Sequence, residues 1–382
     1  MRTIPFGKPI IGEEEKKAVL DVLSGPILVH GPKAKEFETA FAQYTKAPYA
    51  VSVSSCTAGL HLACLALDLG RGGKLWTVPN TFVASANCGL YCGADVDFVD
   101  IDPDTWNISV PALEEKFKAA QASGTLPDIL VPVHFSGQSC DMKAIKALSD
   151  RYGFKIVEDA AHCTGASYDG RKVGDCRYSD MAVFSLHPVK IITTGEGGVI
   201  TTNSEETYKR LLRLRTHGIT RNPAEMTRKP DGPWYFEQLD LGYHYRITDI
   251  QAALGLSQMA RMDGYVKRRQ ELVARYNKKL AGLKLKLPTV SKDCVSSWHL
   301  YVVRVDASRR REIFDKLRAD GIGANVHYIP VHTHPYFKEL GFKEGMYPEG
   351  ERYYAEAITL PLYPALTEEQ QDYICDRLAA AL

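Results

Sequence analysis

The alternation of apolar runs and helical patterns between residues 48 and 202 constrains the fold more than any other feature of this chain. Seven short runs have the length and composition of buried strands. They are residues 49–54, 74–79, 96–101, 128–135, 154–159, 180–186 and 197–202. Helical patterns, such as residues 112–121 and 142–153, separate several of these runs. This order predicts an α/β domain with a mostly parallel sheet, which binds ligands beyond the carboxyl ends of its strands.

The pattern changes after Arg246. Thr248, followed by Gln251, has the spacing of a capping box that opens a helix. The helical pattern runs to about Leu280, and we expect it to break at Gly264. Fewer strand-like runs follow, at 299–306 and 323–330, and the last helix begins after Thr367 with the same T-x-x-Q spacing.

A chain of 382 residues exceeds the size at which a single hydrophobic core stops growing. We therefore predict a large domain over residues 13–248 and a smaller C-terminal α+β domain over 249–382, with residues 1–12 as an N-terminal arm. The polar segment 220–238 predicts a long loop, and loops of this length are usually functional or mobile.

The composition argues against several classes of protein. The formal net charge of +1 gives no reason to expect nucleic acid or a membrane surface as partner. No apolar run approaches the length of a membrane span, and the first residues lack a signal-peptide core. The nine irregularly placed cysteines favour a reducing, cytoplasmic location. Cys88 and Cys92 have no second metal-type pair, so no metal site is predicted.

The segment 185–202, SLHPVKIITTGEGGVITT, contains the first candidate for chemistry. Lys190 follows an apolar strand and precedes the glycine-rich turn 195–198. A lysine at the edge of a sheet is partly desolvated, which favours the neutral amine that forms a Schiff base. Taken alone, Lys190 favours a surface lysine, because most lysines lie at the surface, and GEGG is usually only a tight turn.

The segment IVEDAAH, residues 156–162, places Asp159 at the carboxyl end of a buried strand. A pyridine cofactor draws electrons only while its ring nitrogen is protonated, and a buried carboxylate keeps that proton in place. The alternative for an isolated aspartate is a helix cap.

The segment 52–67, SVSSCTAGLHLACLAL, joins a strand to an apolar helix through small hydroxylated residues. Free amide groups at a helix start form an anion site. Thr57 and Ala58 are placed to donate their backbone N–H groups to a phosphate. The alternative is that Ser54 or Ser55 only caps the helix.

These three segments, in this order along the chain, resemble those of a known family. The chain resembles the DegT/DnrJ/EryC1/StrS family of sugar aminotransferases, which have the type I (aspartate aminotransferase) fold of enzymes that depend on pyridoxal phosphate (PLP). The resemblance covers nearly the whole chain. It rests on residues 31–44, 54–63, 78–87, 131–142, 157–168, 184–198, 215–218, 241–255 and 325–330.

The resemblance implies a role for each matching residue. Lys190 forms the imine with PLP, Asp159 pairs with the pyridine nitrogen, and Ser185 joins Thr57 and Ala58 at the phosphate. Phe82 lies where the family stacks an aromatic ring on the cofactor. His162 lies where the family has His or Gln near the cofactor's ring oxygen, although a core histidine bonded to the backbone is a close alternative.

The chain departs from the family pattern at His244. The family usually has Asn in the G-x-N-x-R segment, where it reaches the phosphate in the neighbouring subunit. His244 can also donate a hydrogen bond, but it could instead point elsewhere. The resemblance implies a homodimer with shared active sites independently of this contact.

The implied reaction transfers an amino group from glutamate, through PLP and pyridoxamine phosphate (PMP), to a keto sugar carried on a nucleotide. Residues 78–87 and 187–198 resemble most the UDP-4-amino-4,6-dideoxy-N-acetyl-β-L-altrosamine transaminases of pseudaminic acid biosynthesis, which aminate C4 of a UDP-linked 4-keto-6-deoxy-HexNAc. Candidate substrate contacts are Lys33, His327, Tyr328 and the loop 220–238, for which packing or solvation are alternatives.

Two alternatives to this reaction stay open. A dehydratase of the same family has histidine in place of the lysine, whereas this chain has Lys190. A non-catalytic nucleotide-sugar-binding protein could use the same fold, but Lys190, Asp159 and the phosphate donors would then have no role.

Overall fold

The computed structural model describes residues 3–382, and its centre is a seven-stranded sheet in the order β1-β9-β8-β5-β4-β2-β3. The strands are β1 Tyr49–Val53, β2 Lys74–Thr77, β3 Asp95–Phe98, β4 Ile129–Leu130, β5 Lys155–Asp159, β8 Met181–Ser185 and β9 Gly198–Thr202. β9 runs antiparallel to β1 and β8, and the pairs from β8 to β3 are parallel. All seven predicted strands are therefore present, and the α/β fold with a mostly parallel sheet is confirmed.

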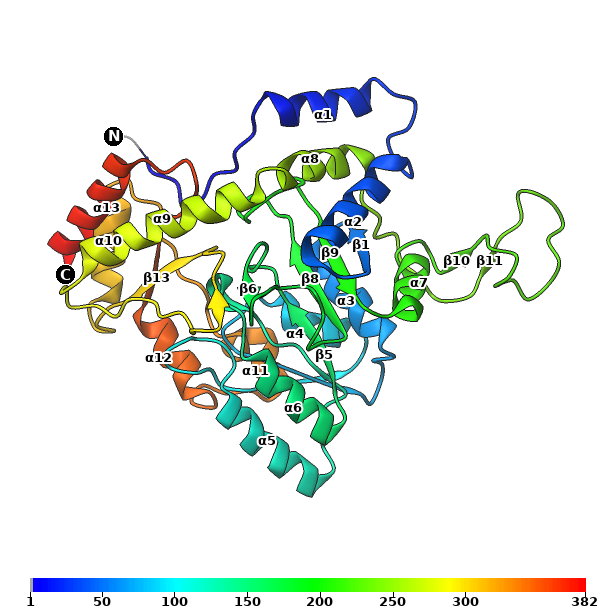
Figure 1. Cartoon of the computed structure of the whole chain (residues 1–382). Coiled ribbons are helices and arrows are strands. Elements are labelled where there is room, and N and C mark those ends of the chain that lie inside the picture. The colour runs from blue at the N-terminus through cyan, green and yellow to red at the C-terminus, as the bar shows by residue number, and fades with distance from the viewer. Residues whose placement is uncertain (1–2) are drawn as a thin grey trace.

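Helices cover both faces of this sheet (Figure 1). They are α2 Pro32–Thr45, α3 Cys56–Ala66, α4 Ala84–Tyr91, α5 Val110–Ser123, α6 Met142–Tyr152 and α7 Glu205–Leu214, whereas α1 Glu13–Leu23 packs on a later helix, residues 249–259. Because side chains alternate along a strand, each strand contributes to two apolar clusters. Val157 and Val183 lie in the cluster on the α3 face, and Ile156 and Phe184 lie in the cluster on the other face.

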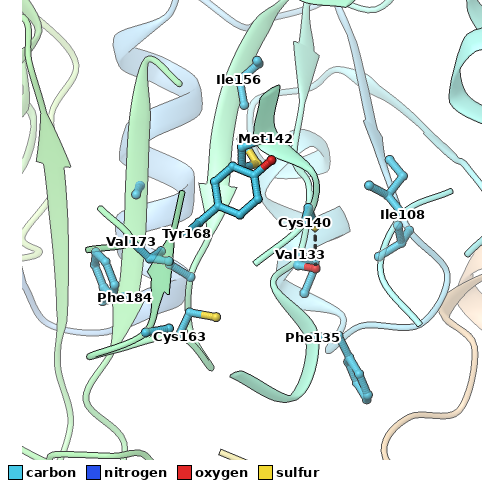
Figure 2. Close-up of a cluster of buried hydrophobic side chains, with 14 of the residues drawn as sticks. Ile108, Val133, Phe135, Cys140, Met142, Ile156, Cys163, Tyr168, Val173 and Phe184 are labelled. Atoms are coloured by element: carbon cyan, nitrogen blue, oxygen red, sulfur yellow. Dashed lines mark hydrogen bonds between the residues drawn. The ribbon is translucent and has the colours of Figure 1, made fainter. Parts of the chain in front are cut away.

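Figure 2 shows part of this second cluster, where Phe184 and Cys163 lie among other buried side chains. The Cys140 thiol donates a hydrogen bond of 3.2 Å to the carbonyl oxygen of Val133. The sulfur is thus both packed and hydrogen-bonded at the end of β4, close to the edge where ligands bind.

The second half of the chain is mostly helical. Its elements are α8 Asp249–Met259, α9 Met262–Leu280, β12 Cys294–Val295, β13 Tyr301–Arg304, α10 Arg310–Ala319, α11 Pro335–Glu339, α12 Pro348–Glu356, β14 Ala357–Leu360 and α13 Glu368–Ala381. Ile4 and residues between 272 and 381 form a separate apolar cluster. α8 and α9 run from the central sheet to this cluster (Figure 1). The domain boundary near 248 and the arm 1–12 stay predictions, and Met1 and Arg2 lie outside the described residues.

Both predicted capping boxes are present, at Thr248 and at Thr367. The predicted break at Gly264 is wrong, because the helix is interrupted between Met259 and Met262 instead. Gly264 lies inside α9. A Cβ at this position would point into open space, so the helix loses no packing contact by having glycine there.

The predicted strand 323–330 is also wrong. Its only ladder contact within the described chain is an isolated bridge between Asn325 and Thr359. β13 instead pairs with β14, residues 357–360, which the sequence pattern did not reveal. β14 occupies the place beside β13, and residues 323–330 lead into the short 3-10 helix Val331–Thr333.

The loop 220–238 is flanked by two short strands, β10 Ile219–Thr220 and β11 Glu237–Gln238, which pair antiparallel. This hairpin extends away from the body of the molecule (Figure 1). Two further strands, β6 Ser167–Tyr168 and β7 Arg171–Lys172, form a three-stranded sheet with β12, and Phe135–Gly137 is a short 3-10 helix. No helix within residues 3–382 is long and apolar enough to cross a bilayer.

Candidate active site

A cavity of about 440 Å³ opens at the carboxyl ends of the central strands. Segments far apart in the sequence meet there: the start of α3, the ends of β5 and β8, and residue 328. The lining residues are Ser55, Cys56, Thr57, Leu60, Thr81, Phe82, Ala84, Val133, Asp159, Ala161, His162, Ser185, His187, Val189, Lys190, Glu196 and Tyr328. The structure thus brings together seven of the predicted site residues, namely Thr57, Phe82, Asp159, His162, Ser185, Lys190 and Tyr328.

The start of α3 offers free backbone donors to this cavity. The Ser55 hydroxyl caps the helix by accepting a hydrogen bond of 3.1 Å from the Ala58 N–H. Within residues 3–382, the N–H groups of Cys56 and Thr57 have no protein acceptor. The free donors at this helix start are therefore the N–H groups of Cys56 and Thr57, whereas the cap engages the predicted donor Ala58.

The glycine-rich turn brings β9 and β8 against this helix start. A Cβ at Gly198 would lie 2.8 Å from the Cys56 nitrogen, so only glycine permits the approach. Gly198 is paired with Ser185 across the ladder between β9 and β8. The Ser185 hydroxyl therefore lies beside the free N–H groups of α3, and together they can bind a phosphate.

Asp159 is 5% exposed and ends β5 at the cavity. One carboxylate oxygen accepts a hydrogen bond of 2.6 Å from the Ser85 hydroxyl, and the other accepts the Ala161 N–H at 3.1 Å. Ser85 is in turn 2.7 Å from the Thr81 hydroxyl. The residues directly after Asp159 form turns and no helix, so the helix-cap alternative is wrong. A carboxylate fixed in this way can hold a proton on a basic ring nitrogen.

Lys190 lies in the turn after β8, and its backbone N–H donates to the His187 carbonyl at 2.9 Å. Burial lowers the pKa of its ammonium group from 10.5 to about 8, although Cys56 and Asp159 partly oppose this shift. A substantial fraction of the amine is therefore neutral near physiological pH and can act as a nucleophile and a base.

His162 lies at the back of the cavity in one defined tautomer. Its Nδ1 accepts the backbone N–H of Ser136 at 3.3 Å, so the ring proton belongs on Nε2, 3.1 Å from the Tyr328 hydroxyl. Burial, together with the Lys190 ammonium, holds the pKa of His162 well below its usual range. The neutral imidazole donates to the Tyr328 hydroxyl. His162 is thus bonded to the backbone and also lines the cavity, and its place near the cofactor's ring oxygen stays a prediction.

Phe82 is 59% exposed although it lines the cavity. Its ring lies 6.3 Å from that of Tyr328. An aromatic face left open beside an anion site and a carboxylate is placed to stack on a flat ring.

Four predicted residues do not line the cavity. They are Ala58, Lys33, His244 and His327. Lys33 forms an ion pair of 2.6 Å with Glu36 near the surface. The two nitrogens of the His327 ring face Thr359 and Asn325 instead.

His244 is exposed, and its ring is stacked on that of His217 at 5.4 Å.

Sequence reasoning missed several residues that line or support the cavity: Cys56, Thr81, Ser85, His187, Val189 and Glu196. Cys56 and Thr81 lie inside the segments that suggested the site. Ser85 emerges only when Asp159 is seen beside it.

The residues of this cavity fit PLP. The α3 start and Ser185 suit its phosphate, Asp159 its ring nitrogen, Lys190 its aldehyde and Phe82 its flat face. No set of three His, Cys, Asp or Glu side chains in residues 3–382 could hold a metal ion. The fold and the site thus define a PLP-dependent enzyme.

The comparisons identify its family. The DegT/DnrJ/EryC1/StrS aminotransferase family matches residues 9–379, so the chain belongs to this family. Spore coat polysaccharide biosynthesis protein SpsC of Bacillus subtilis is 40% identical over 380 residues, covering 98% of this chain and 95% of SpsC.

Solved structures agree with this assignment. The sugar aminotransferase Spr1654 of Streptococcus pneumoniae in its PMP form has a TM-score of 0.90 and 31% identity, covering 99% of this chain and 98% of that one. It is also known in a PLP form. PseC of Helicobacter pylori, an aminotransferase involved in pseudaminic acid biosynthesis, has a TM-score of 0.89 and 26% identity, covering 100% and 99%. The protein is a sugar aminotransferase with PLP and PMP as the two forms of its cofactor.

Proposed function

We propose that this enzyme aminates C4 of a UDP-linked 4-keto-6-deoxy-HexNAc sugar with glutamate as amino donor. The observation that carries the proposal is the single cavity that contains Lys190, Asp159 and the free N–H groups of α3. The sugar class is supported by the similarity to PseC and by the resemblance of residues 78–87 and 187–198 to pseudaminic acid transaminases.

Bound PLP supplies an aldehyde that exchanges the amino group and a pyridine ring that withdraws electrons from the reacting carbon. The N–H groups of Cys56 and Thr57 and the Ser185 hydroxyl would hold its phosphate. Asp159, fixed by Ser85, would hold the proton on its ring nitrogen. Lys190 Nζ, while neutral, would react with the aldehyde, and in each half-reaction it would carry a proton between the substrate carbon and the cofactor's C4′.

The two alternative functions fit the cavity less well. A dehydratase of this family has histidine where this chain has Lys190. A non-catalytic sugar-binding protein has no use for a half-buried lysine whose pKa is lowered to about 8 beside a carboxylate that Ser85 positions. The visible absorbance of the purified protein separates a catalyst from a binding protein.

We also propose a homodimer with shared active sites, in which His244 of each subunit faces the phosphate of the other. The exposed position of His244, outside the cavity of its own chain, supports this proposal. All nine cysteines are free, which supports a reducing compartment such as the cytoplasm.

The decisive experiment incubates the enzyme with glutamate and a panel of UDP- and dTDP-linked keto sugars, followed by mass analysis of the products. The expected result is an amino sugar formed from the UDP-linked 4-keto-6-deoxy-HexNAc in preference to the dTDP-linked sugars. Amination of only a dTDP-linked sugar, or at another carbon, would contradict the proposed substrate while leaving the sugar aminotransferase assignment intact.

A further inference from the structure

Tyr328 lines the active-site cavity, and its hydroxyl takes part in a single hydrogen bond within residues 3–382. The hydroxyl oxygen lies 3.1 Å from Nε2 of His162. Because the other nitrogen of that ring accepts the Ser136 N–H at 3.3 Å, Nε2 carries the ring proton and donates a hydrogen bond to the tyrosine oxygen. The one proton of the tyrosine hydroxyl is therefore available to a molecule in the cavity.

The orientation of His162 is fixed from behind by contacts with distant parts of the chain. Ser136 has a left-handed backbone, with φ of 64°, and in this conformation its N–H meets His162. Such a conformation is costly for a residue other than glycine, and two hydrogen bonds hold it here. The Ser136 hydroxyl donates to the Leu300 carbonyl at 2.7 Å, and the Leu300 N–H donates to the Ser136 carbonyl at 3.2 Å. The Ser297 hydroxyl donates to the carbonyl oxygen of His162 itself at 3.0 Å.

The backbone of Tyr328 is fixed as well. Its N–H donates at 3.3 Å to the side-chain oxygen of Asn80, which is fully buried. The Val331 N–H donates at 2.9 Å to the carbonyl oxygen of Pro79. These two bonds hold the tyrosine beside the segment that carries Phe82, whose ring lies 6.3 Å from that of Tyr328. Contacts within the protein thus hold the hydroxyl in position, which is the condition for electrostatic catalysis.

The two side chains of this pair keep their protons in place. Burial, and to a smaller extent the charge of Asp159, raises the pKa of Tyr328 above its usual value. Burial, together with the Lys190 ammonium, lowers the pKa of His162. Both groups are therefore neutral near physiological pH. A tyrosine of this kind donates a hydrogen bond and retains its proton.

We propose that Tyr328 is a catalytic residue whose hydroxyl donates a hydrogen bond to the keto oxygen of the substrate. His162, Ser136 and Asn80 are its positioning residues. The inference rests on the proposed function, in which glutamate and a keto sugar react in turn at one site. Since Tyr328 and Lys190 line the same cavity of about 440 Å³, a substrate carbon that reaches Lys190 enters the space that Tyr328 lines.

The keto oxygen changes its bonding in both half-reactions. In the sugar half-reaction a C–N bond forms, the C–O bond breaks, and the oxygen leaves as water with two protons that were on the attacking amine. In the donor half-reaction the same changes run in reverse, and water supplies the keto oxygen of 2-oxoglutarate. Negative charge develops on this oxygen in each direction, and a donor held in position stabilises it. Tyr328 keeps its own proton throughout.

The test separates this C–O step from the removal of the Cα proton of glutamate. Lys190 removes that proton without any change at a C–O bond, so exchange of the Cα hydrogen for deuterium in D2O does not need Tyr328. In the Tyr328→Phe holoenzyme, single-turnover formation of 2-oxoglutarate should fall about 100-fold, whereas Cα exchange should stay within about twofold of the wild type. Mass spectrometry measures both rates.

The matched control is Tyr353→Phe. Tyr353 is fully buried outside the cavity, and its ring packs against Phe135 as that of Tyr328 does. Both rates should stay unchanged in this variant. The same loss in Tyr353→Phe as in Tyr328→Phe would overturn the proposal, and so would an equal loss of exchange and conversion in Tyr328→Phe, or an unchanged conversion.

A pH titration of the visible absorbance is the second readout. It should be the same in Tyr328→Phe and in the wild type, because the hydroxyl acts on the oxygen of the substrate. A shifted titration would place the hydroxyl on the ring oxygen of the cofactor and would also overturn the proposal. Failure of the proposed function gives a different result, because the wild-type enzyme would then not exchange the Cα hydrogen of glutamate. The same two rates are in that case measured with the amino acid that does exchange.

Discussion

Lys190 is the residue whose chemistry can be read most directly. The lysine lies at the cavity between β8 and the glycine-rich turn, close to Asp159 and Cys56. We predict that borohydride treatment of the yellow holoenzyme fixes the cofactor to Lys190, as seen by peptide mapping. Lys190→Ala should abolish amination without unfolding the protein, because a lysine at a cavity contributes little packing. A label on any other lysine would contradict the proposed site.

The lowered pKa of Lys190 gives a second prediction. A lysine with a pKa of 10.5 stays protonated up to high pH, whereas Lys190 loses its proton near pH 8. Since only the neutral amine reacts with an aldehyde, the rate at which the apoenzyme captures PLP should rise as the pH rises through about 8 and then level off. Stopped-flow absorbance measures this rate. A rate that climbs steadily to beyond pH 10, as expected for a solvated lysine, would argue against the buried site.

Asp159 provides the negative charge that would keep the cofactor's ring nitrogen protonated. Asp159→Asn keeps the shape of the side chain but removes the charge that holds a proton on the ring nitrogen. We expect kcat to fall by about 100-fold or more, while borohydride still attaches the cofactor to Lys190. Steady-state kinetics and absorbance spectra measure the two effects separately. The matched control is Asp141→Asn, which retains the cap of α6 because Asn caps helices as well as Asp does. It should leave kcat unchanged, and an equal loss in both variants would contradict the assigned role.

The roles of residues whose flanking sequence indicates their position in the fold could be predicted. Roles that depend on contact with a residue far away in the sequence could not. Lys190 and Asp159 each follow an apolar strand, and that position already predicts the edge of a sheet. Ser85 becomes a site residue only because folding brings it 2.6 Å from Asp159, which is 74 residues away in the sequence. The tautomer of His162 likewise depends on Ser136, whose position no local pattern reveals.

At the scale of elements, burial determined which strands could be predicted from the sequence. Six of the seven central strands are buried over most of their length, which makes them largely apolar runs, whereas β3 at the edge of the sheet is buried only at Phe98. β14, residues 357–360, lies directly after α12 without a turn signal, and so its pattern merged with the helix. The run 323–330 contains the same kinds of residue as a strand, but β14 takes the place beside β13.

The capping box of α8 links an element to the site. The Gln251 side chain accepts the Thr248 N–H at 2.9 Å and donates to the Glu196 carbonyl, in the glycine-rich turn, at 2.7 Å. We predict that Thr248→Ala lowers the free energy of unfolding by about 1 kcal/mol, because the helix loses its side-chain cap. Urea denaturation measures the change. Thr248→Ser, which keeps a capping hydroxyl, serves as control and should remain within about 0.5 kcal/mol of the wild type.

At the scale of the whole molecule, apolar side chains remain uncovered on the isolated chain. Trp234 in the hairpin loop is 72% exposed, and Leu241, three residues before His244, is 79% exposed. Ile27, Leu28 and Val29, between α1 and α2, are also exposed. Exposed apolar surface of this extent is unusual for a monomer and supports the proposed homodimer.

The proposed dimer makes His244 the residue that links assembly to cofactor binding. In a two-fold dimer each subunit gives the same contact that it receives, so both phosphate sites should lose a donor in His244→Ala. Because the cofactor then binds across the interface, it should stabilise the dimer, and its removal should loosen it.

We predict that His244→Ala weakens PLP affinity about tenfold, the loss expected for one hydrogen bond to a charged group, while borohydride still labels Lys190. His244→Asn should restore the affinity, since its amide supplies a donor, and His334→Ala, a change in a partly exposed histidine outside the cavity, should have no effect. Sedimentation of the apo and holo forms, with a PLP titration of each variant, measures both quantities. An active monomer would refute the shared site. An unchanged affinity in His244→Ala, with the dimer intact, would remove only His244 from it, because the apolar surface at Leu241 and Trp234 would still need a partner.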